Sequence, residues 1–183
     1  MFRILAAVIC LHLLLGIVHC SQFNTTNEHK GYIFNKADGH GYKIMYRAKS
    51  WENAKKCCAE DGAKLAVPKT EEQFTFLQNL VKGMHYPSIV GTHHKLVVYL
   101  GISNLENYKI WKNVDGENIE KTGFHSWAGL YNGSPFSDDP AQPHCAAMDG
   151  MNHGLREFWC HLRQPYICEI QSDTKNQTEN PMT

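Results

Sequence analysis

The fold is decided by the stretch CAAMDGMNHGLREFWCHLRQPYICE, which occupies residues 145–169. This short segment carries Cys145, Cys160 and Cys168. Three cysteines this close together in a secreted chain indicate disulfide crosslinks rather than buried free thiols. A second cysteine-bearing stretch, WENAKKCCAEDGAKL, lies far upstream at residues 51–65 and supplies candidate partners.

Together the two stretches resemble the ends of a C-type lectin-like domain. The upstream stretch matches that family's pattern Trp-x-x-Ala-x-x-x-Cys-x-x-x-Gly-Ala-x-Leu at Trp51, Ala54 and Cys58 and on through Leu65. The downstream stretch matches the family's Pro-aromatic-Ile-Cys-Glu ending at 165–169. The resemblance covers residues 31–170, and within the family the chain is similar to secreted single-domain immune lectins of invertebrates.

The resemblance implies both the architecture and the crosslinks. The implied fold is α+β, with two helices flanking a small mixed, mainly antiparallel sheet from which a long irregular ligand loop emerges. The implied disulfides are Cys58–Cys168 and Cys145–Cys160. The first would close a loop of about 110 residues and stabilise the fold by about 4–5 kcal/mol in the chain-entropy model.

The N-terminal residues point to the secretory pathway. Arg3 precedes a mostly apolar run, Ile4 to Val18, which is too short and interrupted to span a bilayer comfortably. We interpret residues 1–20 as a cleaved signal peptide, the alternative being an uncleaved anchor. The mature protein is then expected to be extracellular, with no membrane span. Outside the lectin-like domain we expect a flexible segment at 21–30 and a disordered tail at 171–183.

Composition excludes several partner classes. The chain has 183 residues, which suits one domain, and its 18 basic residues balance 18 acidic ones. With no net charge and no basic run, nothing favours nucleic acid or an anionic membrane as a partner.

Cys57 is left over once signal-peptide cleavage removes Cys10 and Cys20 and the implied pairs are formed. At 100° per residue, Cys58 lies within about 20° of Trp51 on the predicted helix, whereas Cys57 points about 120° away. We therefore expect Cys57 to be reachable and predict a disulfide-linked homodimer through it. Two alternatives stay open: a half-buried reduced thiol, or an internal bridge to a retained Cys20.

The positions that bind calcium and sugar in the family are degenerate here. The loop motif falls on Ser134, Pro135 and Phe136, and the family's Trp-Asn-Asp falls on Leu155, Arg156 and Glu157. Calcium needs six to eight oxygens, whereas Phe136 offers none and Arg156 adds a positive charge. Only Glu157 keeps a carboxylate, so we expect a degraded calcium site and no cofactor.

Arg156 has a second possible role. It could pair with Asp138 or Asp139 and hold the loop in place of the metal. The alternative is that all three are solvated loop charges, each contributing little.

Three sequons predict N-glycosylation, at Asn24, Asn132 and Asn176. A glycan on Asn132 would cover the family's usual sugar site, although the proline after that sequon disfavours modification.

Catalysis and metal binding find no support in the motifs. The chain contains no nucleophile elbow, phosphate loop or zinc-spaced histidine pair. Two hypotheses follow: a secreted protein that recognises microbial or host glycans, or a lectin-like module that binds a protein after losing its metal site.

Overall fold

The computed structural model describes residues 31–93, 95, 97–128 and 144–171. Within this part of the chain, eight strands form one sheet, accompanied by three α-helices and one 3-10 helix. The strands are β1 Ile33–Phe34, β2 His40–Lys49, β3 Lys64–Leu65, β4 Val98–Ser103, β5 Lys112–Asn113, β6 His144–Met148, β7 Arg156–Trp159 and β8 Gln164–Gln171. The helices are α2 Trp51–Glu60, α3 Glu71–Lys82, η1 Tyr86–Ser88 and α4 Ile119–Thr122.

The sheet is mixed and mainly antiparallel, as predicted. Its strand order is β1-β2-β8-β4-β6-β7, with β3 also paired to β8 and β5 to β4. The parallel contact joins β4 to β8 at Tyr99 and Tyr166, and the other strand pairs run antiparallel. Gln171, predicted as the first residue of the tail, is instead the last residue of β8.

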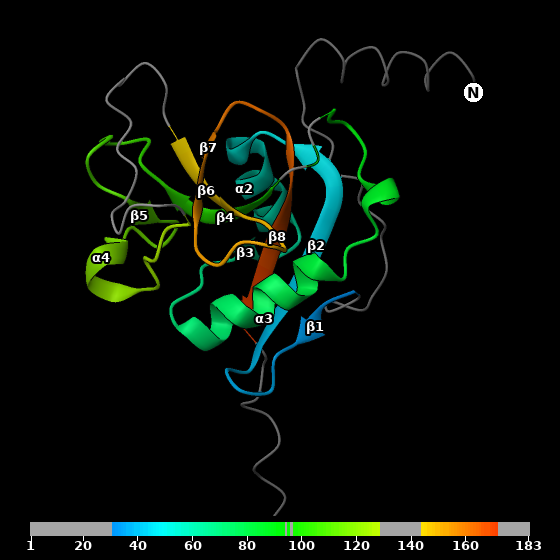
Figure 1. The fold of residues 1–183 in the computed structure, drawn as a ribbon, viewed down its shortest axis with the longest axis horizontal. Coiled ribbons are helices and arrows are strands. Elements are labelled where there is room, and N and C mark those ends of the chain that lie inside the picture. The colour runs from blue at the N-terminus through cyan, green and yellow to red at the C-terminus, as the bar shows by residue number, and fades with distance from the viewer. Residues whose placement is uncertain (1–30, 94, 96, 129–143, 172–183) are drawn as a thin grey trace, which may run out of the picture.

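The two long helices flank the sheet, so the core has two halves (Figure 1). Neighbouring residues of a strand point to opposite faces. On β8, Ile167 therefore packs into the half that contains α3, whereas Tyr166 and Cys168 pack into the half that contains α2. On β4, Leu100 belongs to the α3 half and Tyr99 to the α2 half. The α+β prediction with two flanking helices is confirmed.

Local sequence signals explain where these helices begin and end. Thr70 caps α3 by accepting a hydrogen bond from the backbone of Gln73, as a capping box requires. Gly62 follows α2 with φ +69°, a left-handed conformation that favours glycine. None of the helices within the described residues combines the length and hydrophobicity needed to cross a membrane.

Both implied disulfides are present. Cys58 is bonded to Cys168, which ties α2 to the central strand β8. Cys145 is bonded to Cys160, which ties the start of β6 to the end of β7. The covalent frame inferred from the resemblance is therefore confirmed.

The environment of Cys57 differs from the prediction. Its side chain is 2% exposed and belongs to the core half around α2, and it is disulfide-bonded. The prediction assumed that α2 buries one face, but this helix packs against β2, β3 and β8 and buries both cysteines. Since the other four described cysteines pair with one another, the partner of Cys57 lies outside the described residues. The reduced-thiol alternative is wrong.

We expect the protein to run as a monomer on a non-reducing gel, with no titratable thiol. A sulfur buried under α2 is out of reach of a second chain unless the helix moves. N-terminal sequencing of the same band tests whether Cys20 is retained. A doubled mass that collapses with reductant and is absent from Cys57→Ser would restore the interchain bridge.

Candidate functional site

The candidate site is the hairpin of β6 and β7, where the family positions Arg156 and Glu157 lie. The disulfide Cys145–Cys160 closes this hairpin, and its register places Ala147 opposite Arg156 and Ala146 opposite Glu157. Because Arg156 and Glu157 are consecutive on a strand, their side chains leave opposite faces. They do not converge on one point, and each has its own partner.

Glu157 lies beside the histidine that begins β6. Its carboxylate Oε1 is 2.9 Å from Nδ1 of His144, and its side chain is 14% exposed. Burial raises the pKa of Glu157 to about 7. Asn104 fixes the backbone of His144, since its Oδ1 accepts from the His144 N–H at 2.9 Å. The pair therefore sits on the sheet, and the Glu157 carboxyl titrates near neutral pH.

Arg156 is paired with Asp149, a residue that the sequence did not single out. Its Nη1 donates to Oδ2 of Asp149 at 2.7 Å. Asp149 also accepts from the backbone N–H groups of Met151 and Asn152, each at 2.7 Å. Burial opposes ionisation of Asp149, but the donors of Asn152, Met151 and Arg156 outweigh it, so the pKa of Asp149 is lowered. Arg156 thus anchors the turn before β7. Asp138 and Asp139, its predicted partners, lie outside the described residues.

A close backbone approach fixes the entry to β7. Leu155, at the family's tryptophan position, is fully buried and exchanges backbone hydrogen bonds with Ser126 and Ala128. Gly154 has φ +105°, and a Cβ atom there would lie 2.7 Å from the nitrogen of Ala128. Glycine is required at this position because any side chain would push the two segments apart.

The described residues do not fit the calcium site of the family. Calcium needs several carboxylate or carbonyl oxygens that are free to bind it. The Glu157 carboxylate already contacts His144, and the neighbouring ligand position holds a cation, Arg156. Within the described segments, no three His, Cys, Asp or Glu side chains gather as a metal site. Ser134, Pro135 and Phe136 lie outside the described residues, and so do the sequons at Asn24, Asn132 and Asn176.

The sequence contains signals for the two partners that were not predicted, His144 of Glu157 and Asp149 of Arg156. A hairpin between Cys145 and Cys160 runs antiparallel, which brings His144 and Glu157 within diagonal reach across the strands. Asp149 begins Asp-Gly-Met-Asn at the end of β6, and an aspartate in such a turn often accepts from the next backbone N–H groups. Its role as an anion facing Arg156 follows from that turn.

Comparisons with known proteins agree with this architecture. The family model of the lectin C-type domain matches residues 47–170. The hemolymph lipopolysaccharide-binding protein of Periplaneta americana is 24% identical over 148 residues, which are 77% of this chain. The match is 52% of that relative, so this chain spans about half of its length.

Solved structures share the fold. The carbohydrate-recognition domain of the mouse scavenger receptor C-type lectin aligns with TM-score 0.61 and 17% identity, covering 79% of this chain and 97% of that one. A calcium-independent type II antifreeze protein aligns with TM-score 0.58 and 17% identity, covering 84% and 98%. At these identities the likeness shows the fold alone.

The Arg156–Asp149 pair predicts an asymmetric response to mutation. The Arg156 side chain is 42% exposed, so Arg156→Ala should destabilise by no more than about 1 kcal/mol, as for a surface pair. Asp149→Ala should cost about 1–3 kcal/mol because the backbone donors of the turn also lose their acceptor. Urea denaturation of both variants measures this. Equal losses would show that Asp149 acts only through Arg156.

The raised pKa of Glu157 predicts a pH-dependent gain from Glu157→Gln. In the folded state the pKa is about 7, above the value of about 4.3 for a free glutamate. The stability contributed by the protonated carboxyl is thus fully present below about pH 4 and is lost as pH rises through 7.

Glutamine mimics the protonated acid, so Glu157→Gln should match the wild type near pH 4 and exceed its unfolding free energy by about 1–3 kcal/mol at pH 8. Thermal melts across this range test it, with the more exposed Glu71→Gln, which removes a carboxylate from another glutamate–histidine pair, as control. A constant offset at every pH would show that His144 keeps Glu157 ionised.

Proposed function

The chain belongs to the C-type lectin domain family, and we propose that it is a secreted recognition protein that binds carbohydrate on microbial or host surfaces without the usual calcium-coordinated mode. Family membership over residues 47–170 supports the carbohydrate part, together with a relative named as a lipopolysaccharide-binding protein. The family is generally non-enzymatic, and the proposed role is binding. An innate-immune setting and an extracellular location are part of the same proposal.

The observation that carries the metal-independent mode is the pairing of Arg156 with Asp149. A cation stands at a position where the family places a calcium ligand, and its charge is already satisfied within the protein. Placing a dication there would set like charges side by side, which costs energy in a partly buried site. A calcium-independent antifreeze protein has the same fold, so this fold does not require the metal.

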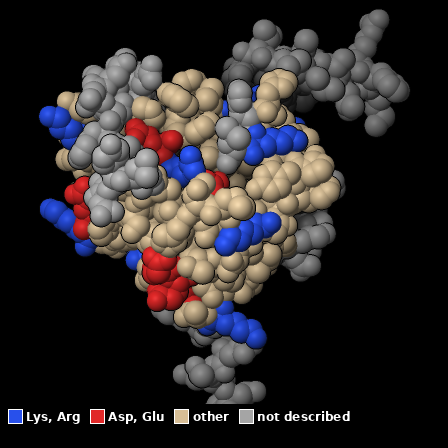
Figure 2. All heavy atoms as spheres, viewed as in Figure 1, with Lys and Arg blue, Asp and Glu red and all other residues tan. Residues whose placement is uncertain are grey.

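Binding of a protein partner is the second candidate. Trp159, on the same hairpin, is 41% exposed, and tryptophan is enriched where binding energy concentrates at protein interfaces. On the face shown in Figure 2, basic and acidic side chains are interspersed among uncharged surface, without one dominant sign. Such a surface suits a protein or a neutral glycan better than a polyanion.

A glycan array probed in millimolar CaCl2 and in EDTA tests the proposal. We expect the same glycans to be bound in both buffers, because the proposed binding mode does not use calcium. Melting curves in the two buffers should coincide, since a metal that binds only the native state would raise the melting temperature. MgCl2 at equal ionic strength controls for salt.

Two outcomes would contradict it. Binding that disappears in EDTA, with a higher melting temperature in CaCl2, would restore the calcium-coordinated mode. An array that is blank in both buffers would remove the carbohydrate function and leave the protein-binding candidate.

A further inference from the structure

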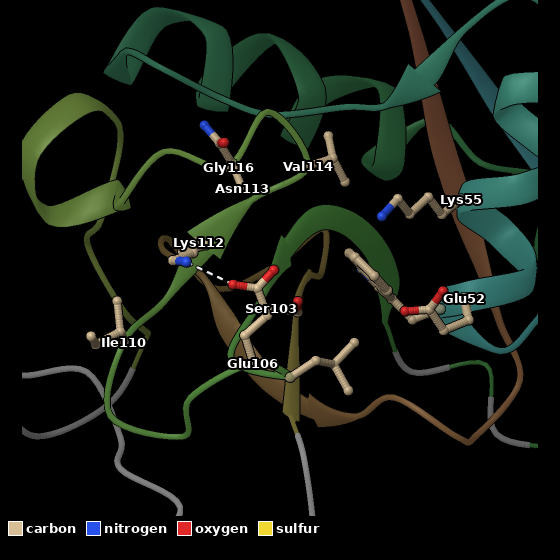
Figure 3. Close-up of a pocket in the computed structure, with 11 residues that line it drawn as sticks. Glu52, Lys55, Ser103, Glu106, Ile110, Lys112, Asn113, Val114 and Gly116 are labelled. Carbon is tan, nitrogen blue, oxygen red and sulfur yellow. Dashed lines mark hydrogen bonds and ion pairs between the residues drawn. The ribbon is translucent and has the colours of Figure 1, made fainter.

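A hollow of about 150 Å³ lies between the start of α2 and the β4–β5 segment (Figure 3). Trp51, Glu52 and Lys55 of α2 form one wall. The other wall is formed by residues of one segment, namely Ser103, Leu105, Glu106, Ile110, Lys112, Asn113, Val114 and Gly116. Within this second wall, Glu106 and Lys112 face each other across the loop and bond at 2.6 Å.

The walls are held by the core rather than by flexible contacts. The Trp51 indole Nε1 donates to the carbonyl of Leu100 at 2.7 Å, and its backbone N–H donates to Cys160 at 2.9 Å. On the other side, Ser103 pairs with Lys112 between β4 and β5. A ligand therefore meets a preformed surface and does not have to order it, which reduces the entropic cost of binding.

The chemistry of the hollow is mixed and electrically balanced. Two carboxylates, Glu52 and Glu106, face two ammonium groups, Lys55 and Lys112. The Lys55 ammonium lies 5.7 Å from the Trp51 ring centroid, and among the described residues neither Lys55 nor Glu52 is ion-paired. Aliphatic side chains complete the lining, namely Leu105, Ile110 and Val114.

We propose that this hollow binds one neutral hexose unit of a glycan, an inference that rests on the carbohydrate function proposed above. A sugar hydroxyl both donates and accepts, so it is matched by walls that offer carboxylates and ammonium groups together. A ligand with net charge would meet a like charge whichever its sign. The aliphatic side chains suit the C–H face of the ring, and a cavity of about 150 Å³ accommodates a single six-membered ring.

The hollow is connected to the candidate site on the β6–β7 hairpin. Asn104 stands between two lining residues, Ser103 and Leu105, and its backbone N–H donates to the carbonyl of His144 at 3.1 Å. His144 in turn lies against Glu157. The loop that lines the hollow is therefore fixed to the start of the hairpin through the buried Asn104.

The test is NMR titration of the full mature chain, labelled with ¹⁵N, in EDTA. Methyl α-mannopyranoside and methyl β-galactopyranoside are the neutral probes, with glucuronate and glucosamine as charged counterparts. We expect a neutral probe to shift the Trp51 indole signal and the backbone signals of 103–112, and to bind more tightly than either charged sugar.

Three variants sharpen the test. Lys55→Met should weaken the neutral probe at least about ten-fold, because a charge-assisted hydrogen bond is lost. Lys56→Met removes the same charge from a residue of α2 that does not line the hollow, and should leave binding unchanged. Glu106→Gln leaves a net positive hollow, so it should weaken neutral probes and strengthen glucuronate.

The outcomes separate this inference from the function on which it rests. If the array is blank and no probe shifts any signal, both fail. If the array is positive but its best-bound oligosaccharide, used as a further probe, shifts only signals of 144–159, the hollow is not a subsite. Equal weakening by Lys55→Met and Lys56→Met would also overturn it.

Discussion

The disulfide between Cys58 and Cys168 is the constraint on which the rest of the structure depends. It fastens α2 to β8, the strand that lies between β2 and β4 and also pairs with β3. Since β8 comes last in the described chain, the closed loop of 110 residues contains the elements from β3 to β7, whereas β1, β2 and most of α2 precede it. Crosslinking over such a distance removes much of the entropy of the unfolded chain. Strands that are distant in sequence then pair with a smaller loss of chain entropy.

The same strand carries a charge that the fold has to satisfy. Glu169 is 4% exposed, and its Oε2 accepts from the Val67 N–H at 2.9 Å while Oε1 lies 2.7 Å from Nδ1 of His40. A buried carboxylate without partners would destabilise the native state strongly. The segment after β3 and the start of β2 are therefore held against β8 by the need to pair Glu169, which adds a polar constraint to the covalent one.

The fold could be predicted from sequence because the Trp51 pattern and the cysteine-rich ending resemble a known family, and because the helix caps are local signals. Residue environments could not, because they depend on what covers each element. Helical periodicity correctly places Cys58 near Trp51, but periodicity says nothing about a second neighbour, and Cys57 is buried as well. Arg156 was predicted to hold the long loop through Asp138 or Asp139, which lie outside the described residues, whereas the partner found within them is Asp149, seven residues away across the turn into β7. The sequence shows charges, and only the hairpin register shows which of them meet.

The distribution of paired and unpaired charges decides where a ligand can bind with the smallest free-energy cost. On the β6–β7 hairpin, Arg156 and Glu157 already have partners, so a ligand there must compete with existing contacts and leave buried groups unsatisfied if it displaces them. At the hollow beside α2, Lys55 and Glu52 are not ion-paired among the described residues, and Trp51 in the wall is held by its hydrogen bond to Leu100. A hydroxyl-rich ligand can bond to Lys55 and Glu52 there without displacing an ion pair of either residue. Under the proposed function, carbohydrate contacts therefore shift from the hairpin towards the hollow, and the buried Asn104 links these two parts of the sheet through its hydrogen bonds to His144.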